Sequence, residues 1–264
     1  MHALTVAHGG QPQRLVLRRF VRADWVAREP DIAKREASAL RLLERSDVPA
    51  PRLLAVDEDG SAAGVPSVLM TRLPGKTVLL PGDMDSWLRQ MAEVLPRIHA
   101  IRPTPDDVPW TYEPYSNLAT LQVPPWTRRP REWETALEVA RRPAPRANEH
   151  LIHRDYHPAN LLWLRGQVSG VVDWVNACRG PAGIDIGHCR RNLALLHGLD
   201  IADHFLDHCL GWAHYNPYWD IITLTDWLPE GETFDGWRDL GIDLTTDVVR
   251  SRADEYVASL VARL

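Results

Sequence analysis

The residues that could do chemistry gather in one short polar segment, His153-x-Asp155-x-x-x-x-Asn160, with Asp173 following thirteen positions later. A loop aspartate such as Asp155 can accept the proton of an attacking hydroxyl group or orient that group. Asn160 offers a neutral oxygen and Asp173 a carboxylate, and both suit a Mg²⁺ ion that bridges phosphate groups. Because phosphoryl transfer depends on positioning and charge neutralisation, these side chains predict phosphate transfer from Mg-ATP to a hydroxyl group.

Three short strands must bring these side chains together. They are predicted at 150–153, 161–165 and 168–173 from apolar runs bounded by turn residues. The last two form a predicted hairpin, which returns Asp173 towards Asn160. The hairpin is therefore the predicted means of joining two metal ligands that lie apart in the sequence.

The N-terminal part of the chain has the pattern of a small β-rich lobe. Strands are predicted at 3–7, 14–20, 53–56 and 66–70, with a turn at 8–11 between the first two. Helical spacing of apolar residues predicts a helix at 31–45. Pro74-Gly75 interrupts the pattern where strands give way to helices, so we predict a lobe boundary there.

The remainder of the chain has mainly helical periodicity. Helices are predicted at 83–100 and 132–141, and most of the chain from 183 onward is predicted to be helical. The segment 102–130, rich in proline and aromatic residues, is predicted to be irregular. The whole pattern indicates an α+β fold with a small β-rich N-terminal lobe and a larger, mainly helical C-terminal lobe.

The segment from His153 to Asp185 resembles the aminoglycoside phosphotransferase family, which includes choline kinase and macrolide kinase relatives and shares the protein-kinase fold. His-Arg-Asp-Tyr-His-Pro-Ala-Asn, Val-Val-Asp-Trp and Gly-Pro-x-x-x-Asp occur in the family's order. The resemblance covers nearly the whole chain and implies a bilobal, protein-kinase-like fold. It also implies that Asp155 is the catalytic aspartate. Asn160 and Asp173 match the family's metal ligands, and Asp185 matches an aspartate that supports the catalytic loop.

In the N-terminal lobe the same resemblance implies a site for ATP. Glu36 matches a helix glutamate that pairs with a strand cation, and Arg18 stands where that cation is normally lysine. Arginine keeps the positive charge, although its planar guanidinium group differs in shape from the compact ammonium group of lysine. We expect adenine to stack near Met70 and to bond to hinge backbone groups around Thr71 to Leu73.

The sequence lacks one recognisable part of that family's pattern. A strand and a Gly- or Ser-containing loop usually precede the first hairpin and cover the phosphates, and neither is recognisable here. Either the start is truncated, or the loop is lost and ATP is held more openly. We therefore expect residues 1–74 to form a nucleotide-binding lobe without that strand and loop. Residues 75–264 are then the catalytic and substrate-binding lobe.

Two histidines of the catalytic segment allow more than one role. We interpret His153 as a structural brace that holds the loop by hydrogen bonds. His157 either contacts the substrate or caps the turn at Pro158, and both interpretations stay open. His188, next to Cys189 further along, is interpreted as an ordinary helix residue.

A second group of histidines has the residue types of a metal site. His204 and His208 are four positions apart, which is helical spacing, and Cys209 follows them. A metal site needs a third and a fourth ligand, and none is evident nearby in the sequence. We therefore interpret this segment as a helix surface with some contact to the core.

Composition and charge exclude several classes of protein. With 45% hydrophobic and 25% charged residues, the chain has the composition of an ordinary globular protein. No apolar run reaches the 18 residues of a membrane helix, and the first residues do not form a secretory signal. Three scattered cysteines predict no disulfide framework, so we expect a cytoplasmic protein without a membrane partner. No basic stripe for nucleic acid is present.

The sequence thus predicts an ATP-dependent phosphotransferase that acts on a hydroxyl group of a small molecule. Aminoglycoside-like, macrolide, choline-like and sugar acceptors stay open. Residues 196–264 carry 4 Lys or Arg against 13 Asp or Glu, and these charges either attract a cationic acceptor or only solvate helix surfaces. The alternative is a nucleotide-binding, pseudokinase-like module without transfer activity. Only eleven residues separate Asp173 from Asp185, which leaves no room for the peptide-docking loop of a protein kinase.

Overall fold

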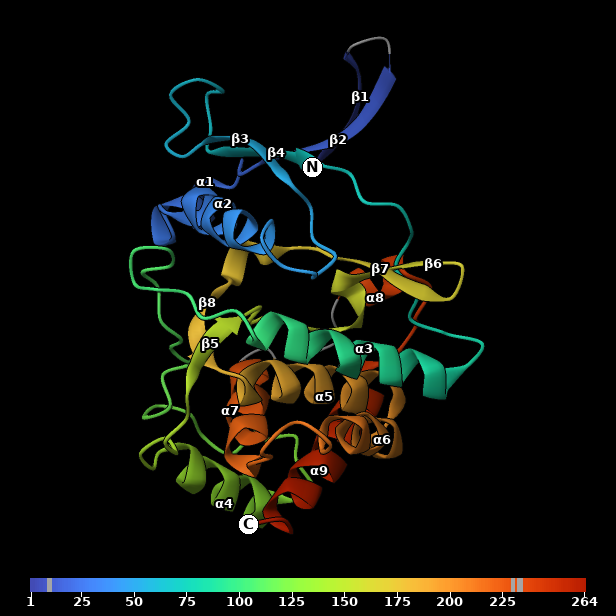
Figure 1. The fold of residues 1–264 in the computed structure, drawn as a ribbon. Helices are drawn as coiled ribbons and strands as arrows, with labels where there is room; N and C mark the ends of the chain where they lie inside the picture. Colours follow the sequence, from blue (N-terminus) through green and yellow to red (C-terminus); the bar gives the residue numbers. More distant parts are fainter. Residues whose placement is uncertain (9–10, 229–230, 232–234) are drawn as a thin grey trace.

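A computed structural model describes residues 1–264 except 9–10, 229–230 and 232–234, and its elements form a small β-rich part and a larger helical part (Figure 1). The N-terminal sheet is antiparallel, with the strand order β1-β2-β4-β3. Its strands are β1 (His2–His8), β2 (Gln11–Arg19), β3 (Leu53–Asp57) and β4 (Ser67–Thr71). The predicted turn between β1 and β2 includes residues 9–10, which lie outside the described residues.

Two helices follow β2, namely α1 (Ala23–Arg28) and α2 (Ile32–Leu43). The apolar residues of α2 recur at helical spacing and are buried, and Glu36 lies among them with 1% of its surface exposed. In Figure 1, α2 runs beneath the sheet, on the side that faces the helical part. It contacts β3 and β4 on one side and the short 3₁₀ helix η2 (Trp174–Asn176) on the other, so it spans the junction of the two parts.

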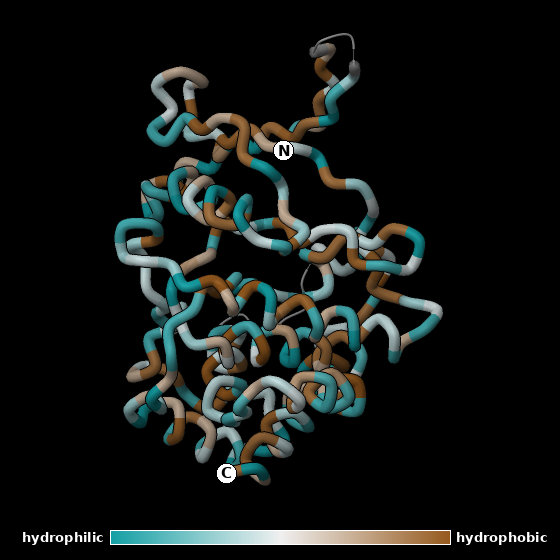
Figure 2. The backbone as a smooth tube through the Cα atoms, in the orientation of Figure 1, coloured by the Kyte–Doolittle hydropathy of each residue, from teal (hydrophilic) through white to brown (hydrophobic). Residues whose placement is uncertain are grey.

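The C-terminal part contains most of the helices. They are α3 (Met84–His99), α4 (Pro130–Ala140), α5 (Gly183–His197), α6 (Leu199–Cys209), α7 (Pro217–Trp227), α8 (Asp235–Asp239) and α9 (Thr246–Val261). Asp83 caps α3, because its carboxylate accepts a hydrogen bond from the Ser86 N–H at 3.0 Å. Brown and teal segments alternate along these helices in Figure 2, as expected of helices that bury one face.

Two small antiparallel pairs of strands lie between the sheet and the helices. One joins β5 (Glu149–Ile152) to β8 (Cys178–Pro181), and the other joins β6 (Leu161–Leu164) to β7 (Gln167–Val171). The 3₁₀ helix η1 (Pro158–Asn160) precedes β6. The Val171 N–H donates to Pro49 at 2.7 Å and fastens this region to the N-terminal part, and Lys76, between β4 and α3, exchanges two backbone bonds with Trp163.

The prediction of an α+β fold with two lobes is confirmed, and so are the irregular segment 102–130 and the helical C-terminal part. The strand predicted at 168–173 ends earlier, at Val171, because Asp173 has φ 67° and cannot continue a strand. α1 and β8 were not predicted. The boundary predicted after residue 74 falls between β4 and α3 and stays a prediction.

Within the part of the chain that the structure describes, no helix is both long enough and apolar enough to cross a membrane.

Candidate active site

The segment from His153 to Asn160 forms a loop between β5 and β6, and one buried carboxylate holds its start. Asp185, in the first turn of α5, is fully buried and accepts hydrogen bonds from the backbone N–H groups of His153 at 3.0 Å and Arg154 at 2.7 Å. His99 Nε2 lies 2.9 Å from the same carboxylate. Arg154 has φ 66°, and this left-handed turn directs two successive N–H groups at Asp185. The loop is thereby anchored to α3 and α5.

His153 is buried and faces away from solvent. Its Nε2 atom hydrogen-bonds to the backbone oxygen of Val172 at 2.9 Å, and its ring lies 4.5 Å from that of Trp174. Both partners flank Asp173 in the sequence. The contacts are those of a brace between the loop and the segment that carries Asp173.

Asp155 points into a partly open site and contacts two histidines. Its Oδ1 atom lies 3.0 Å from His188 Nε2 and 3.6 Å from His157 Nε2, and its side chain is 30% exposed. Burial alone would raise the pKa of Asp155, but the nearby His157 and His188 outweigh burial and hold the pKa well below its ordinary value. Asp155 is therefore ionised at neutral pH.

His188 is the contact that the sequence analysis missed. It lies on α5, one turn after Asp185, and burial together with the neighbouring Arg191 lowers its pKa to about 4. Its Nε2 atom is 2.9 Å from Arg191 Nη2 and 3.0 Å from Asp155 Oδ1, so it can accept from the first or donate to the second, but not both. The spacing Asp185-x-x-His188 was the signal available, since it puts both residues on one face of a helix.

His157 has the second of its two predicted roles in this structure. Its Nδ1 atom accepts a hydrogen bond from the Ala159 N–H at 3.3 Å, which caps η1 at Pro158. Its other ring nitrogen faces Asp155. Burial lowers the pKa of His157, although the neighbouring Asp155 carboxylate opposes this shift.

Asn160 and Asp173 are brought together as the hairpin prediction required. Leu161 pairs with Val171 in the β6–β7 hairpin, and the Val172 N–H donates to the backbone oxygen of Asn160 at 3.0 Å. Asn160 Nδ2 donates to Asp155 Oδ2 at 3.2 Å, and no described residue donates to its amide oxygen. The amide oxygen of Asn160 and the segment that carries Asp173 therefore lie together at the end of the loop from His153 to Asn160. An amide oxygen and a carboxylate are donors of the kind that Mg²⁺ prefers.

Arg18, Glu36 and Asp173 form a partly buried chain of ionisable groups across the two parts of the molecule. Arg18 Nη1 lies 2.9 Å from Glu36 Oε1 and 2.6 Å from Asp173 Oδ1. Burial opposes the charge of Arg18, but the two carboxylates outweigh burial and raise its pKa. Burial also raises the pKa of Glu36 to about 7, despite the attraction of Arg18. Glu36 Oε2 is buried without a hydrogen-bond partner among the described residues.

The predicted hinge residues lie at the end of β4, where the chain leaves the sheet. Met70 is 6% exposed, and the backbone N–H of Thr71 donates to Arg52 at 2.9 Å. The Thr71 N–H is therefore already paired, and the bonding of adenine to hinge groups around Thr71 to Leu73 stays a prediction. Among the described residues, the Leu73 N–H has no hydrogen-bond acceptor, so it is the predicted hinge donor still available.

The sequence of this chain is similar to those of known phosphotransferases. A model of the phosphotransferase enzyme family matches residues 2–218. A homoserine kinase of Pseudomonas aeruginosa is 31% identical over 156 residues, which are 53% of this chain and 47% of that protein. The chain thus spans about half the length of the curated relatives it matches.

Solved structures agree on the fold. A putative aminoglycoside phosphotransferase from Ralstonia eutropha superposes with a TM-score of 0.61 at 15% identity, covering 98% of this chain and 92% of that one. A thermostable mutant of the aminoglycoside phosphotransferase APH(4)-Ia, solved with AMP-PNP and hygromycin B, gives 0.62 at 16% identity, covering 98% and 94%. At these identities the likeness shows the fold alone, and it confirms the predicted kinase-like architecture.

Proposed function

Because this chain belongs to the phosphotransferase enzyme family, we propose that it transfers the γ-phosphate of ATP to a hydroxyl group of a small molecule. The observation that carries the proposal is the meeting of Asp155, Asn160 and Asp173 on one loop and one hairpin. Asn160 is bonded through its amide nitrogen to Asp155 and through its backbone oxygen to the residue before Asp173. One base and two oxygen ligands therefore face the same small region.

In the proposed reaction Asp155 accepts the proton of the acceptor hydroxyl group. The hydroxyl oxygen then forms a bond to the γ-phosphorus of ATP, the bond from that phosphorus to the bridging oxygen breaks, and ADP leaves with the electron pair. His188, on α5, lies 3.0 Å from Asp155 and holds it in place when its Nε2 atom donates to the carboxylate. Arg18, oriented by Glu36, supplies positive charge to the phosphates.

Asn160 Oδ1 and the Asp173 carboxylate are the groups that would hold Mg²⁺, since both are hard oxygen donors. When bound there, the ion neutralises charge on the ATP phosphates. Arg18 would share Asp173 with the ion, and its contact with Glu36 would keep it beside the phosphates. Leu73 N–H is the proposed partner for adenine at the hinge. Asp185 and His153 are proposed to position the loop without touching substrate.

The acceptor is proposed to lie beside Asp155, between the catalytic loop and α5. Arg154 is next to Asp155 in the sequence and its guanidinium lies 4.0 Å from the Tyr115 ring, whereas the Arg191 guanidinium is buried and donates to the backbone oxygen of Thr223 at 2.9 Å. We propose that the Arg154 guanidinium favours an acceptor with a carboxylate over a polycationic one, because the carboxylate gains attraction that a cation would lose. A hydroxylated amino acid such as homoserine, the substrate named by the Pseudomonas relatives, fits this charge.

The test is Mg²⁺-dependent ADP formation with a panel of homoserine, hygromycin B, kanamycin and choline. Asp155→Asn serves as the matched variant, because the amide preserves shape while removing the base. We expect turnover with at least one acceptor, homoserine above the aminoglycosides, and a loss of about two to four orders of magnitude in the variant. Equal turnover in the variant would show that Asp155 is not the base. A preference for kanamycin would contradict the acceptor proposal alone.

One observation favours the second candidate function, nucleotide binding without transfer. Arg18 Nη1 contacts Asp173 Oδ1. If a bound nucleotide does not displace Arg18 from this oxygen, the proposed metal site lacks one of its ligands. In that case Mg-ATP would raise the melting temperature of the protein, while every acceptor of the panel would fail to stimulate ADP formation.

A further inference from the structure

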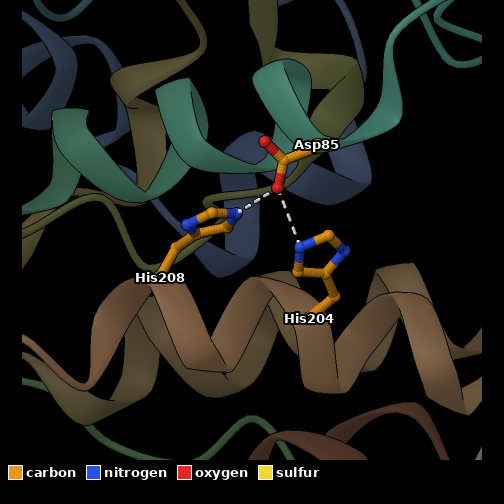
Figure 3. Close-up of side chains that lie close together, drawn as sticks. All are labelled: Asp85, His204 and His208. Carbon is orange, nitrogen blue, oxygen red and sulfur yellow. Dashed lines mark hydrogen bonds and ion pairs between the residues drawn. The ribbon is translucent and has the colours of Figure 1, made fainter.

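Three potential metal ligands meet at a place remote in sequence from the catalytic loop (Figure 3). Asp85 lies in the first turn of α3, and His204 and His208 lie on α6. Asp85 Oδ1 is 2.9 Å from His204 Nε2 and 3.2 Å from His208 Nε2. Figure 3 shows both rings rising from the same face of α6 towards the single carboxylate above them.

The two histidines are arranged as a pair that can bind one ion. Four positions along a helix put both side chains on one face, one turn apart. Their rings are 5.0 Å apart and inclined by 26°, and the Nε2 atom of each ring faces the same Asp85 oxygen. Cys209 takes no part, because it is completely buried in the core on another face of α6. The missing third ligand was invisible in the sequence because it is 119 positions before His204.

The spacing of the three ligand atoms matches a tetrahedral site. With metal–ligand bonds of about 2.0–2.2 Å, neighbouring ligand atoms of a tetrahedron are about 3.3 Å apart. Here the three atoms all lie within 4.8 Å of one another, and both Asp–His separations are close to that tetrahedral edge. Small rotations of exposed side chains therefore admit an ion between them.

We propose that Asp85, His204 and His208 bind a divalent transition-metal ion, with Zn²⁺ as its probe, and that this ion fastens the start of α3 to α6. Two imidazoles and one carboxylate suit Zn²⁺ and its neighbours in the first transition row, whereas Mg²⁺ prefers oxygen ligands alone. The site is therefore chemically distinct from the one proposed for Asn160 and Asp173. The side chains of Asp85 and His204 are 62% and 42% exposed, which leaves a path for the ion and a fourth position for water.

The competing explanation is a pair of ordinary surface hydrogen bonds. Neutral histidines can both donate to Asp85, and exposed contacts of that kind contribute little to stability. The two explanations differ in what they predict for added metal. An ion binding only the folded arrangement stabilises it, whereas isolated hydrogen bonds give no response to Zn²⁺.

The experiment titrates Zn²⁺ into metal-stripped protein by calorimetry and follows Co²⁺ by visible absorption. The variants are Asp85→Asn, His204→Ala and His208→Ala, with His214→Ala as the matched control, since His214 is exposed elsewhere on the surface. We expect one equivalent of Zn²⁺ to bind wild type and His214→Ala alike, with a rise in melting temperature. Each of the three site variants should weaken binding by at least about tenfold.

Failure of wild type to bind Zn²⁺ at micromolar concentration would overturn the proposal. So would unchanged affinity in a double variant lacking both His204 and His208, because the ion would then occupy another group such as Asp155 with His188. All the variants are expected to keep the basal ATP turnover of wild type, so this test is independent of the proposed function.

Discussion

The Arg18 guanidinium donates to the Asp173 carboxylate at 2.6 Å, and this bond joins the N-terminal sheet to the segment after β7. The same nitrogen lies 2.9 Å from Glu36, so one cation is shared by two carboxylates from different parts of the chain. The arrangement holds positive charge next to the proposed metal ligands. In the function proposed above, binding of Mg-ATP redistributes these three charges.

The first prediction concerns Arg18 itself. Arg18→Ala should raise the KM for ATP about ten- to a hundredfold, because a charge-assisted hydrogen bond contributes roughly 1.5–3 kcal/mol. Arg19→Ala is the control, since Arg19 lies on the other face of β2 and donates to Ala63. Steady-state kinetics with varied ATP will decide, and equal KM values in both variants would remove Arg18 from the nucleotide site. Arg18→Lys should retain most of the affinity.

The parts of the site that were predictable from sequence are those made by neighbours along the chain. The segment from Asp155 to Asp173, with Asn160 inside it, is short, and a single hairpin suffices to bring the three side chains together. Apolar periodicity predicted α2 and α3 for a similar reason, because the apolar residues that identify a helix all lie within that helix.

The missed parts depend on contacts between distant segments. His188 contacts Asp155 only because α5 packs against the catalytic loop, and Asp85 meets His204 only because α3 packs against α6. β8 was missed for a local reason, since its sequence Cys-Arg-Gly-Pro contains two residues that usually end strands. The pairing of β8 with β5 outweighs the weak tendency of these four residues to form a strand.

The second prediction concerns Asp185. Asp185→Ala should lower the free energy of unfolding by about 3–5 kcal/mol, because it leaves two backbone N–H groups and His99 without their buried acceptor. Glu138→Ala, an exposed change on α4, should alter stability by less than about 0.5 kcal/mol. Urea unfolding of the three proteins measures both effects. A loss for Asp185→Ala no larger than that of the control would show that the loop is held by other contacts.

The third prediction uses the pKa of His188, which burial and Arg191 lower to about 4. The folded state therefore favours neutral His188, so this contribution to stability is present above the ordinary pKa near 6.5 and is lost as the pH falls towards 4. Wild type should lose on the order of 2 kcal/mol more than His188→Gln between about pH 7 and pH 4.5. Thermal unfolding at several pH values measures the difference in stability between wild type and His188→Gln. A difference that does not change with pH would contradict a buried neutral imidazole.

The last prediction concerns Glu36 and has the opposite sign. Burial raises the pKa of Glu36 from 4.5 to about 7, so the folded state favours the protonated form. Its contribution to stability is then complete below pH 4.5 and is lost as the pH rises through 7. Glu36→Gln is neutral at every pH and should gain stability relative to wild type, by on the order of 1–3 kcal/mol between about pH 5 and pH 8.

The same substitution should weaken nucleotide binding, because the neutral amide of the Glu36→Gln variant no longer holds Arg18 by an ion pair. A protein that is more stable at high pH yet binds Mg-ATP less tightly would be the expected result, measured by chemical unfolding and by calorimetry with ATP. Lower stability of the variant at high pH would instead mean that Arg18 keeps Glu36 fully ionised in the folded state. Glu36→Asp separates the two effects, because it retains the charge but shortens the reach to Arg18, so it should lose affinity without gaining stability at high pH.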